Sequence, residues 1–128
     1  MKYLLDTHAF LWFVSDDGRL SSKAGAIIKN SKNEVFFSAV SAWELSMKIK
    51  LGRLTIEEEL GPFIIKQLSE NNFSTLSITL FHSIYTLKLA DIHKDPFDRM
   101  LIAQSQVEDM PLISKDKNIK KYKIPVVW

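Results

Sequence analysis

The sequence predicts an α/β protein, a three-layer α/β/α sandwich with a central, mainly parallel sheet of about five strands. Short apolar runs alternate with longer segments whose apolar residues recur every three or four positions, a pattern typical of alternating strands and helices. Strands that are joined through helices pair in parallel by right-handed crossovers. A chain of 128 residues has the usual size of one domain, so residues 1–128 are expected to form a single domain.

The first half of the chain contains two expected strands, each followed by helical segments. Residues 3–5 and 35–39 are apolar, β-branched or aromatic, and we interpret both as buried strands. Helical character follows the first strand at residues 9–14, and Ser21 is a plausible N-cap for the next helix. The helix after the second strand has one apolar stripe and is expected to end near Gly52. The stripe consists of Val40, Trp43, Met47, Leu51 and Leu54.

The second half repeats the alternation and ends on two strands. Asp95-Pro96 is a clear helix start, because proline at the first helical position loses no needed hydrogen bond and the preceding aspartate can cap the helix. The expected elements are a helix at 63–68, a strand at 75–78, a helix at 81–90, a helix from 95 to about 108, a strand at 111–114 and a strand at 124–128.

Composition indicates a soluble protein of the cytoplasm with a polyanionic partner. The chain has no cysteine, which excludes disulfides and thiolate metal sites and suits a reducing compartment. It has no apolar run long enough for a signal peptide or a membrane span, so no membrane partner is expected. Setting aside four acids discussed below leaves 11 acidic against 17 basic residues, a basic surround that suits nucleic acid, although excess lysine is also a common solubilising feature.

Four acidic residues fall at or near the ends of expected strands. Asp6 directly follows the first strand, Asp116 lies just beyond residues 111–114, and Glu44 is placed in the first turn of the helix after the second strand. Sites in parallel sheets form at the carboxyl ends of the strands, so these three are expected on the same edge. Asp98, in the first turn of the helix that starts at Asp95, depends more on overall packing.

Each of these acids also has a purely structural explanation. Glu44 completes an S-x-x-E capping box, and Asp6 and Asp95 are suited to cap helices. Asp98 would be favoured by the dipole of its helix, and Asp116 could shape a turn. Taken singly, each acid is explained well enough in this way. Taken together, acids that converge on one edge favour a functional site.

Carboxylates held close together repel one another, so each must take up a proton or find a cation. Mg²⁺ or Mn²⁺ resolves the conflict, because such hard ions bind a few carboxylates, waters and phosphate oxygens. An ion of this kind polarises a phosphoryl group and lowers the pKa of water. The pattern therefore predicts metal-dependent phosphodiester hydrolysis, with Asp6, Glu44, Asp98 and Asp116 as both the metal ligands and the catalytic acids.

The segments that carry the acids resemble those of the PIN-domain nucleases, in particular VapC-type toxins. They are LLDTH at residues 4–8, SAVSAWE at 38–44, DPFDRMLIAQ at 95–104 and LISKD at 112–116, and the resemblance spans essentially the whole chain. It implies a PIN-like nuclease domain over residues 1–128, Mg²⁺ or Mn²⁺ dependence, RNA cleavage, a homodimer and a cognate antitoxin whose C-terminal segment occupies the active groove. It assigns the acidic quartet to Asp6, Glu44, Asp98 and Asp116, with Asp95 second as N-cap or outer ligand.

Several neighbouring residues are weaker candidates for substrate binding. Lys48 lies four residues after Glu44 and could orient that carboxylate, contact phosphate or form an ordinary surface pair. Thr7 and Ser114 could hydrogen-bond an acid or a metal-bound water, although such hydroxyls often satisfy local backbone. Arg99 could reach phosphate or simply face solvent.

Histidines, lysines and aromatic residues receive a more cautious interpretation. The three histidines lack ligand spacing and are interpreted as structural or surface residues, with only His8 near enough to Asp6 to merit a test. Five lysines around Asp116 could guide an RNA backbone or form a solvated loop; they are Lys115, Lys117, Lys120, Lys121 and Lys123. An aromatic group is interpreted as core; it consists of Trp12, Phe13, Phe36, Phe37 and Trp43.

Two other functions compete with a toxin-type endoribonuclease. A non-catalytic RNA- or protein-binding module would keep the fold, but it would not need all four acids. A phosphatase of the haloacid dehalogenase type would use Asp6 as nucleophile, but its D-x-D pattern needs an acid at the position of His8.

Overall fold

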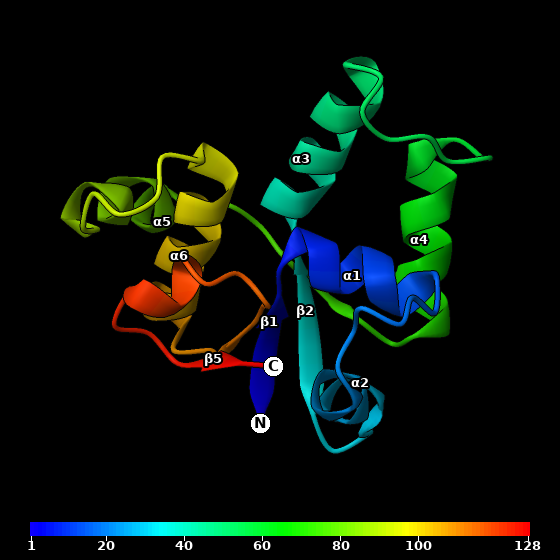
Figure 1. The fold of residues 1–128 in the computed structure, drawn as a ribbon, viewed down its shortest axis with the longest axis horizontal. Coiled ribbons are helices and arrows are strands. Elements are labelled where there is room, and N and C mark those ends of the chain that lie inside the picture. Colours follow the sequence, from blue (N-terminus) through cyan, green and yellow to red (C-terminus); the bar gives the residue numbers. More distant parts are fainter.

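The computed structural model describes residues 1–128, which form a five-stranded sheet in the order β3-β2-β1-β4-β5. Every neighbouring pair of strands is parallel, and helices cover both faces (Figure 1). The strands are β1 (Lys2–Leu5), β2 (Glu34–Ser38), β3 (Ser74–Leu76), β4 (Leu112–Ile113) and β5 (Val126–Val127). The predicted α/β fold and its parallel sheet are confirmed.

Helices occupy nearly all the predicted segments. They are α1 (Thr7–Val14), α2 (Ser22–Lys29), α3 (Ala39–Lys50), α4 (Leu60–Glu70), α5 (Leu80–Tyr85) and α6 (Pro96–Glu108), with 3-10 turns η1 (Thr86–Lys88) and η2 (Ile119–Lys121). Ser21 caps α2, as predicted, by accepting a hydrogen bond from the Ala24 amide. The predicted helix at 81–90 is shorter and ends in the turn η1. No helix combines the length and the apolar content needed to cross a bilayer.

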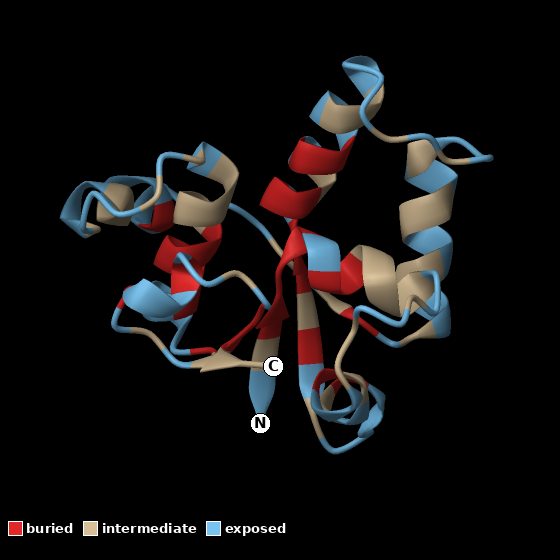
Figure 2. Cartoon of the chain, viewed as in Figure 1, coloured by how far each residue is buried: buried red, intermediate tan, exposed pale blue.

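Alternating side chains of the central strands build a separate hydrophobic cluster on each face of the sheet. Leu5 and Ile113 point to the face covered by α1, α2 and part of α4, whereas Leu4 and Leu112 point to the face covered by α6. Figure 2 shows the buried residues concentrated on β1, β2 and the helix surfaces turned toward them. This alternation, which follows from the two-residue period of a strand, produces the three layers.

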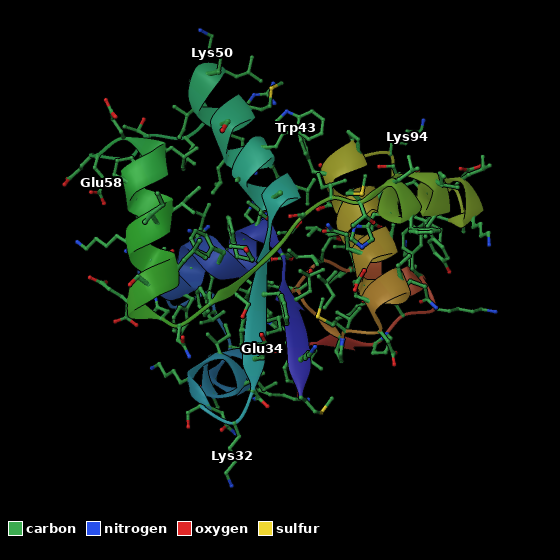
Figure 3. The ribbon with its side chains drawn as sticks, turned by 180° about the vertical axis from the view of Figure 1, so that it is seen from behind. Lys32, Glu34, Trp43, Lys50, Glu58 and Lys94 are labelled. Atoms are coloured by element: carbon green, nitrogen blue, oxygen red, sulfur yellow. The ribbon has the colours of Figure 1, made fainter.

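One prediction about the core is wrong. Trp43, interpreted as a core residue, is 54% exposed on α3, and Met47 and Leu51 of the same stripe are also exposed. The helix instead buries Val40, Ser41, Glu44 and Leu45, a face rotated relative to the apolar stripe. Seen from behind, the Trp43 side chain stands out from α3 (Figure 3). Its ring packs edge-on against the ring of Phe97 in α6, with 4.9 Å between the ring centroids.

The strand order places a crevice between the carboxyl ends of β1 and β4. From β1 the chain adds β2 and β3 on one side, then crosses back to add β4 and β5 on the other. The connections therefore leave β1 and β4 in opposite directions, which opens the sheet edge where ligands bind in such folds. Asp6 follows β1 and Asp116 lies shortly after β4, so the topology brings both acids to this crevice.

Candidate active site

Asp6 is buried at the carboxyl end of β1 and also caps α1. Its Oδ1 accepts a hydrogen bond of 2.6 Å from the Ala9 amide. Burial raises the pKa of the Asp6 carboxyl above its ordinary value, although hydrogen bonds from the Ser114 hydroxyl and the Ala9 amide oppose the rise. The capping explanation is therefore correct, and it leaves Asp6 as a buried acid with a strong preference for a proton or a cation.

Glu44 lies in the second turn of α3, one turn further along the helix than predicted. The N-cap is Ser38, whose hydroxyl accepts from the Val40 amide, so the capping-box explanation for Glu44 is wrong. The Oε1 atom of Glu44 instead accepts a 2.6 Å hydrogen bond from the Thr7 hydroxyl, and Oε2 pairs with Lys48 Nζ at 3.0 Å. Thr7 and Lys48 thus hold this buried carboxylate at the edge of the sheet where Asp6 lies.

Asp98 and Asp116 come together around a histidine that the sequence did not single out. His93 Nε2 lies 2.9 Å from Asp98 Oδ2 and 3.4 Å from Asp116 Oδ2. His93 was interpreted as a structural or surface residue, and the structure places it between two of the predicted site acids. The metal-ligating atoms of these three residues lie within 4.8 Å of one another. Spacing along the chain gave no signal, because the residues come from a loop, from α6 and from the segment after β4.

The remaining predicted polar residues have local partners. Asp95 caps α6, with its Oδ1 accepting from the Phe97 and Asp98 amides. The Ser114 hydroxyl accepts from the Asp116 amide at 3.1 Å, which ties the turn after β4 to the strand end. Asp116 does shape a turn, because its Oδ1 accepts from the Asn118 amide at 2.7 Å. Its second oxygen remains directed toward His93.

Arg99 adopts neither of the two arrangements considered for it. Its guanidinium donates to the carbonyl oxygens of Thr86, Ala90 and His93 and to the Tyr122 hydroxyl. The side chain is only partly exposed, and most of its donors are directed at the backbone of the 86–93 segment. Arg99 fixes the loop that carries His93.

Repulsion among the acids is strong at Asp98. Burial, followed by the charges of Asp95, Glu44 and Asp116, raises the pKa of Asp98 to about 7, and the nearby His93 opposes the rise. Glu44 also raises the pKa of Asp6. The predicted acids are thus close enough to affect one another's ionisation, although they belong to four separate parts of the chain.

Comparison with known proteins places this geometry in a family. The family model of the PIN domain matches residues 3–125. The chain belongs to the PIN domain family. Ribonuclease VapC22 of Mycobacterium tuberculosis is 26% identical to it over 129 residues, with 98% of this chain and 97% of the relative aligned. The resemblance noted from the acidic segments is confirmed.

Two solved structures share the fold of this PIN domain. The structure of VapBC2 from Rickettsia felis bound to a promoter DNA fragment superposes with a TM-score of 0.73 at 15% identity, covering 100% of this chain and 98% of that one. The structure of FitAcB from Neisseria gonorrhoeae gives 0.66 at 14% identity, covering 100% and 97%. At sequence identities this low, the superpositions show that the fold is shared and nothing beyond the fold.

The acids of this PIN domain fit a divalent cation. The predicted donors are carboxylate oxygens, which hard ions prefer, and they include no thiolate. Asp6 and Asp98, both buried or nearly so, have raised pKa values that a bound cation would relieve. Asp98 and Asp116 have ligand atoms close enough to share an ion, and Asp6 and Glu44 are the further acids that the sequence predicts for it. Asp95 Oδ1 is engaged as the cap of α6.

A polar cavity of about 290 Å³ opens beside two of these acids. Asp6, Asp116, His8, Trp12 and Lys115 line it, at the crevice between β1 and β4. The Lys115 ammonium lies 5.9 Å from the centre of the Trp12 ring, and the His8 ring lies 5.6 Å from the same indole. A cation, an imidazole and an aromatic ring therefore surround the acids, a combination suited to the phosphate and base of a nucleotide.

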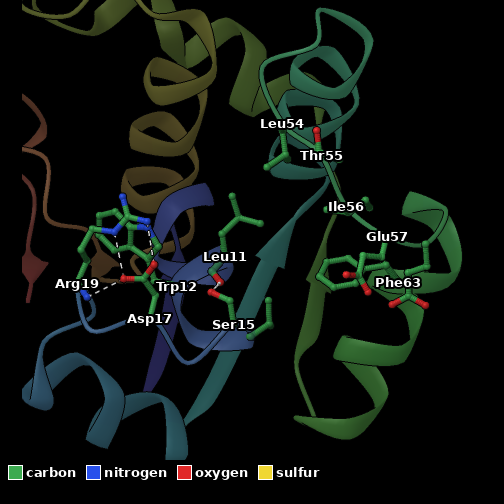
Figure 4. A pocket seen from close by; sticks show the side chains of 12 residues that line it. Leu11, Trp12, Ser15, Asp17, Arg19, Leu54, Thr55, Ile56, Glu57 and Phe63 are labelled. Atoms are coloured by element: carbon green, nitrogen blue, oxygen red, sulfur yellow. Dashed lines mark hydrogen bonds and ion pairs between the residues drawn. The ribbon is translucent and has the colours of Figure 1, made fainter.

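A larger groove, of about 650 Å³, lies away from the acids. Figure 4 shows Leu11, Leu54 and Phe63 lining it between the end of α1 and the connection from α3 to α4. Acidic side chains, among them Glu57 and Glu58, stand beside these apolar ones. The groove contains none of the four predicted site acids.

Proposed function

We propose that this PIN domain is a Mg²⁺- or Mn²⁺-dependent endoribonuclease that hydrolyses RNA phosphodiester bonds as the toxin of a toxin–antitoxin pair in the cytoplasm. The observation that carries the proposal is the meeting of Asp98, Asp116, Glu44 and Asp6 at one sheet edge, where they repel one another. The curated relative described above is itself named a ribonuclease. A non-catalytic binding module would not need this concentration of acids, of which Asp6 and Glu44 are buried.

Each group of the chain has a separate task in this mechanism. A divalent ion held by the carboxylates would supply Lewis acidity and neutralise charge at a phosphodiester. Thr7 and Lys48 hold Glu44 in place through their contacts with its two oxygens. Ser114 donates to Asp6 and anchors the turn of Asp116. In this arrangement the carboxylates are held ready by the fold before any ion binds.

The surroundings of the acids support RNA as the substrate. Lys115 and His8 line the cavity that holds Asp6 and Asp116, and further lysines follow in the segment 117–123. The lysine ammonium groups around the site attract a phosphate backbone and offset the repulsion between the acids and RNA. Arg99 is not part of this surface, because its donors are engaged by backbone carbonyls.

The proposal predicts that the purified protein cleaves RNA when Mn²⁺ or Mg²⁺ is present and that EDTA stops cleavage. Gel analysis of a labelled RNA, with ion re-addition after chelation, measures both effects. Internal cuts with restored activity on re-addition support the endonuclease. A protein that binds RNA equally well with and without ions, and never cuts it, would instead be the non-catalytic module.

We propose that a cognate antitoxin places its C-terminal segment in the active groove, as the resemblance implies, and a second segment in the larger groove. The apolar lining of the larger groove and the acidic Glu57 and Glu58 suit an amphipathic segment that carries basic residues. The fold neighbour from Rickettsia felis is a VapBC2 complex, which motivates this partner class. Co-purification with a small protein encoded beside the gene tests the idea, and Leu54→Arg should weaken that complex.

We further propose that the protein is a homodimer formed through α3 and α5, which both pack on α6. Trp43 and Met47 are exposed on α3 and Leu51 at its C-cap. Phe81 of α5 is 77% exposed, and Leu87 of η1 is 88% exposed. Soluble monomers rarely expose so many large apolar side chains in one region. In a symmetric dimer, a second copy would cover the exposed apolar residues of α3 and those of α5 and η1.

Light scattering should therefore give about twice the chain mass of 14.7 kDa. The double variant Phe81→Lys/Leu87→Lys is expected to give the mass of one chain at the same concentration, because both side chains are exposed and contribute little to the monomer fold. The matched variant Ile65→Lys changes an exposed apolar residue on α4 and should stay dimeric. A wild-type mass of one chain would contradict the proposal.

A further inference from the structure

His93 links two of the acids that reach the site from different elements. Asp98 belongs to the first turn of α6, and Asp116 to the segment after β4. The Nε2 atom of His93 lies within hydrogen-bonding distance of an Oδ2 atom from each, at 2.9 Å and 3.4 Å. The ring is mostly buried, with 17% of the side chain exposed. One nitrogen therefore faces two carboxylates at once.

The second ring nitrogen determines what Nε2 can do. The backbone amide of Asp95 donates a hydrogen bond to His93 Nδ1 at 3.3 Å, so Nδ1 presents its lone pair. In a neutral imidazole with an unprotonated Nδ1, the proton is on Nε2. The Nε2–H group thus donates toward Asp98 and Asp116. The same nitrogen cannot offer a lone pair to a metal while it carries this proton.

The backbone of His93 is held as firmly as its ring. Its amide donates to the Tyr122 hydroxyl at 2.8 Å, and its carbonyl accepts from Arg99 Nη1 at 3.3 Å. Arg99 also donates to Tyr122, so the three residues form a closed set of contacts. Arg99 is one residue after Asp98 on α6, which couples the position of the ring to the helix that carries that acid.

We propose that His93 is a positioning residue that donates Nε2–H to Asp98 and Asp116 and so sets the separation of these carboxylates for a divalent cation, without being a ligand itself. This inference rests on one part of the proposed function, namely that Asp98 and Asp116 are metal ligands. Groups of this kind commonly orient metal-binding carboxylates, and removing one weakens metal affinity by roughly 10- to 100-fold.

The opposite role for His93 is that of a nitrogen ligand. The three residues lie close enough to hold an ion together, and an imidazole ligand would favour transition metals over Mg²⁺. That role requires the proton to move to Nδ1, where it would face the Asp95 amide hydrogen. The two roles therefore differ in the tautomer and in whether an amide can replace the ring.

Two amide variants provide a matched test, measured as Mn²⁺ affinity by titration calorimetry without RNA. In His93→Gln the amide N–H can occupy the place of Nε2–H, whereas in His93→Asn the shorter side chain can replace only Nδ1. We expect His93→Gln to bind Mn²⁺ within about threefold of wild type, and His93→Asn and His93→Ala to bind it about tenfold or more weakly. Thermal unfolding of each variant identifies any that fail to fold.

Spectroscopy provides a readout that a general structural role would not affect. In the metal-free protein, ¹⁵N NMR should show His93 Nδ1 as an unprotonated nitrogen and Nε2 as a protonated one. Spin-echo spectroscopy of the Mn²⁺-loaded protein detects histidine nitrogens bound directly to the ion. We expect the wild-type and His93→Gln spectra to show the same bound nitrogens, because His93 is not a ligand. A bound nitrogen assigned to His93 in this way would overturn the proposal.

Equal loss of affinity in His93→Gln and His93→Ala would also overturn the proposal. The fate of the proposed function is separate. A wild-type protein that binds Mn²⁺ but does not cut RNA would refute the nuclease assignment and leave the role of His93 intact. A wild-type protein that binds no Mn²⁺ would refute both.

Discussion

Replacing Asp6 by asparagine is expected to reduce metal-dependent RNA cleavage by about 100-fold or more while the fold persists. A metal-binding carboxylate supports several kcal/mol of charge stabilisation in the transition state, and each ~1.4 kcal/mol is a factor of ten in rate. Asparagine accepts hydrogen bonds at helix N-caps as well as aspartate does, so the bond from the Ala9 amide can remain. Cleavage of labelled RNA and thermal unfolding measure the two effects.

The control for Asp6→Asn is the same chemical change at an acid outside the site. Asp109 ends α6 at φ 54°, a left-handed conformation that asparagine tolerates, and it is exposed. It lies at the end of α6 opposite to Asp98. Asp109→Asn is therefore expected to cleave RNA at the wild-type rate. If Asp6→Asn did so too, the activity would come from a contaminating nuclease and the site assignment would fail.

The sequence predicted the positions of Asp6 and Asp116 correctly because strand-end geometry is a local property. A buried apolar run that stops at an acid gives the strand end, and the parallel sheet then places both acids on one edge. Glu44 was placed on the correct helix but one turn too early. The S-x-x-E pattern was misleading, because Ser38 rather than Ser41 caps α3, a choice decided by where β2 ends.

His93 and Trp43 were missed because their roles depend on tertiary packing. His93 is far in sequence from Asp116, and no spacing rule connects a loop residue with the end of a strand on the other side of a helix. Trp43 has the helical periodicity of a core residue, but periodicity shows that a face is apolar and does not say what covers it. Asp98 depended on family resemblance for the same reason, since its neighbours come from other elements.

The raised pKa of Asp98 predicts that the stability of the metal-free protein depends on pH. The folded carboxyl has a pKa of about 7 against an ordinary value of 3.8, so between these pH values the folded state holds a proton that the unfolded chain has released. The contribution of Asp98 to stability is therefore largest below pH 4 and falls as the pH rises to about 7. At pH 8 the folded protein holds an ionised carboxylate against its repelling neighbours.

Asp98→Asn removes this penalty, because its amide is neutral at every pH. The melting temperature of metal-free Asp98→Asn should therefore exceed that of wild type by roughly 5 °C or more at pH 8, with a much smaller difference at pH 5. Mg²⁺ should raise the melting temperature of wild type more at pH 8 than at pH 6, because protons compete with the ion for the carboxylate. In Asp98→Asn, Mg²⁺ should raise the melting temperature far less. Calorimetric melting across this pH range measures both. A difference between the two proteins that stayed constant from pH 5 to pH 8 would contradict the assignment of the raised pKa to Asp98, and with it the view that crowded carboxylates prepare this site for a cation.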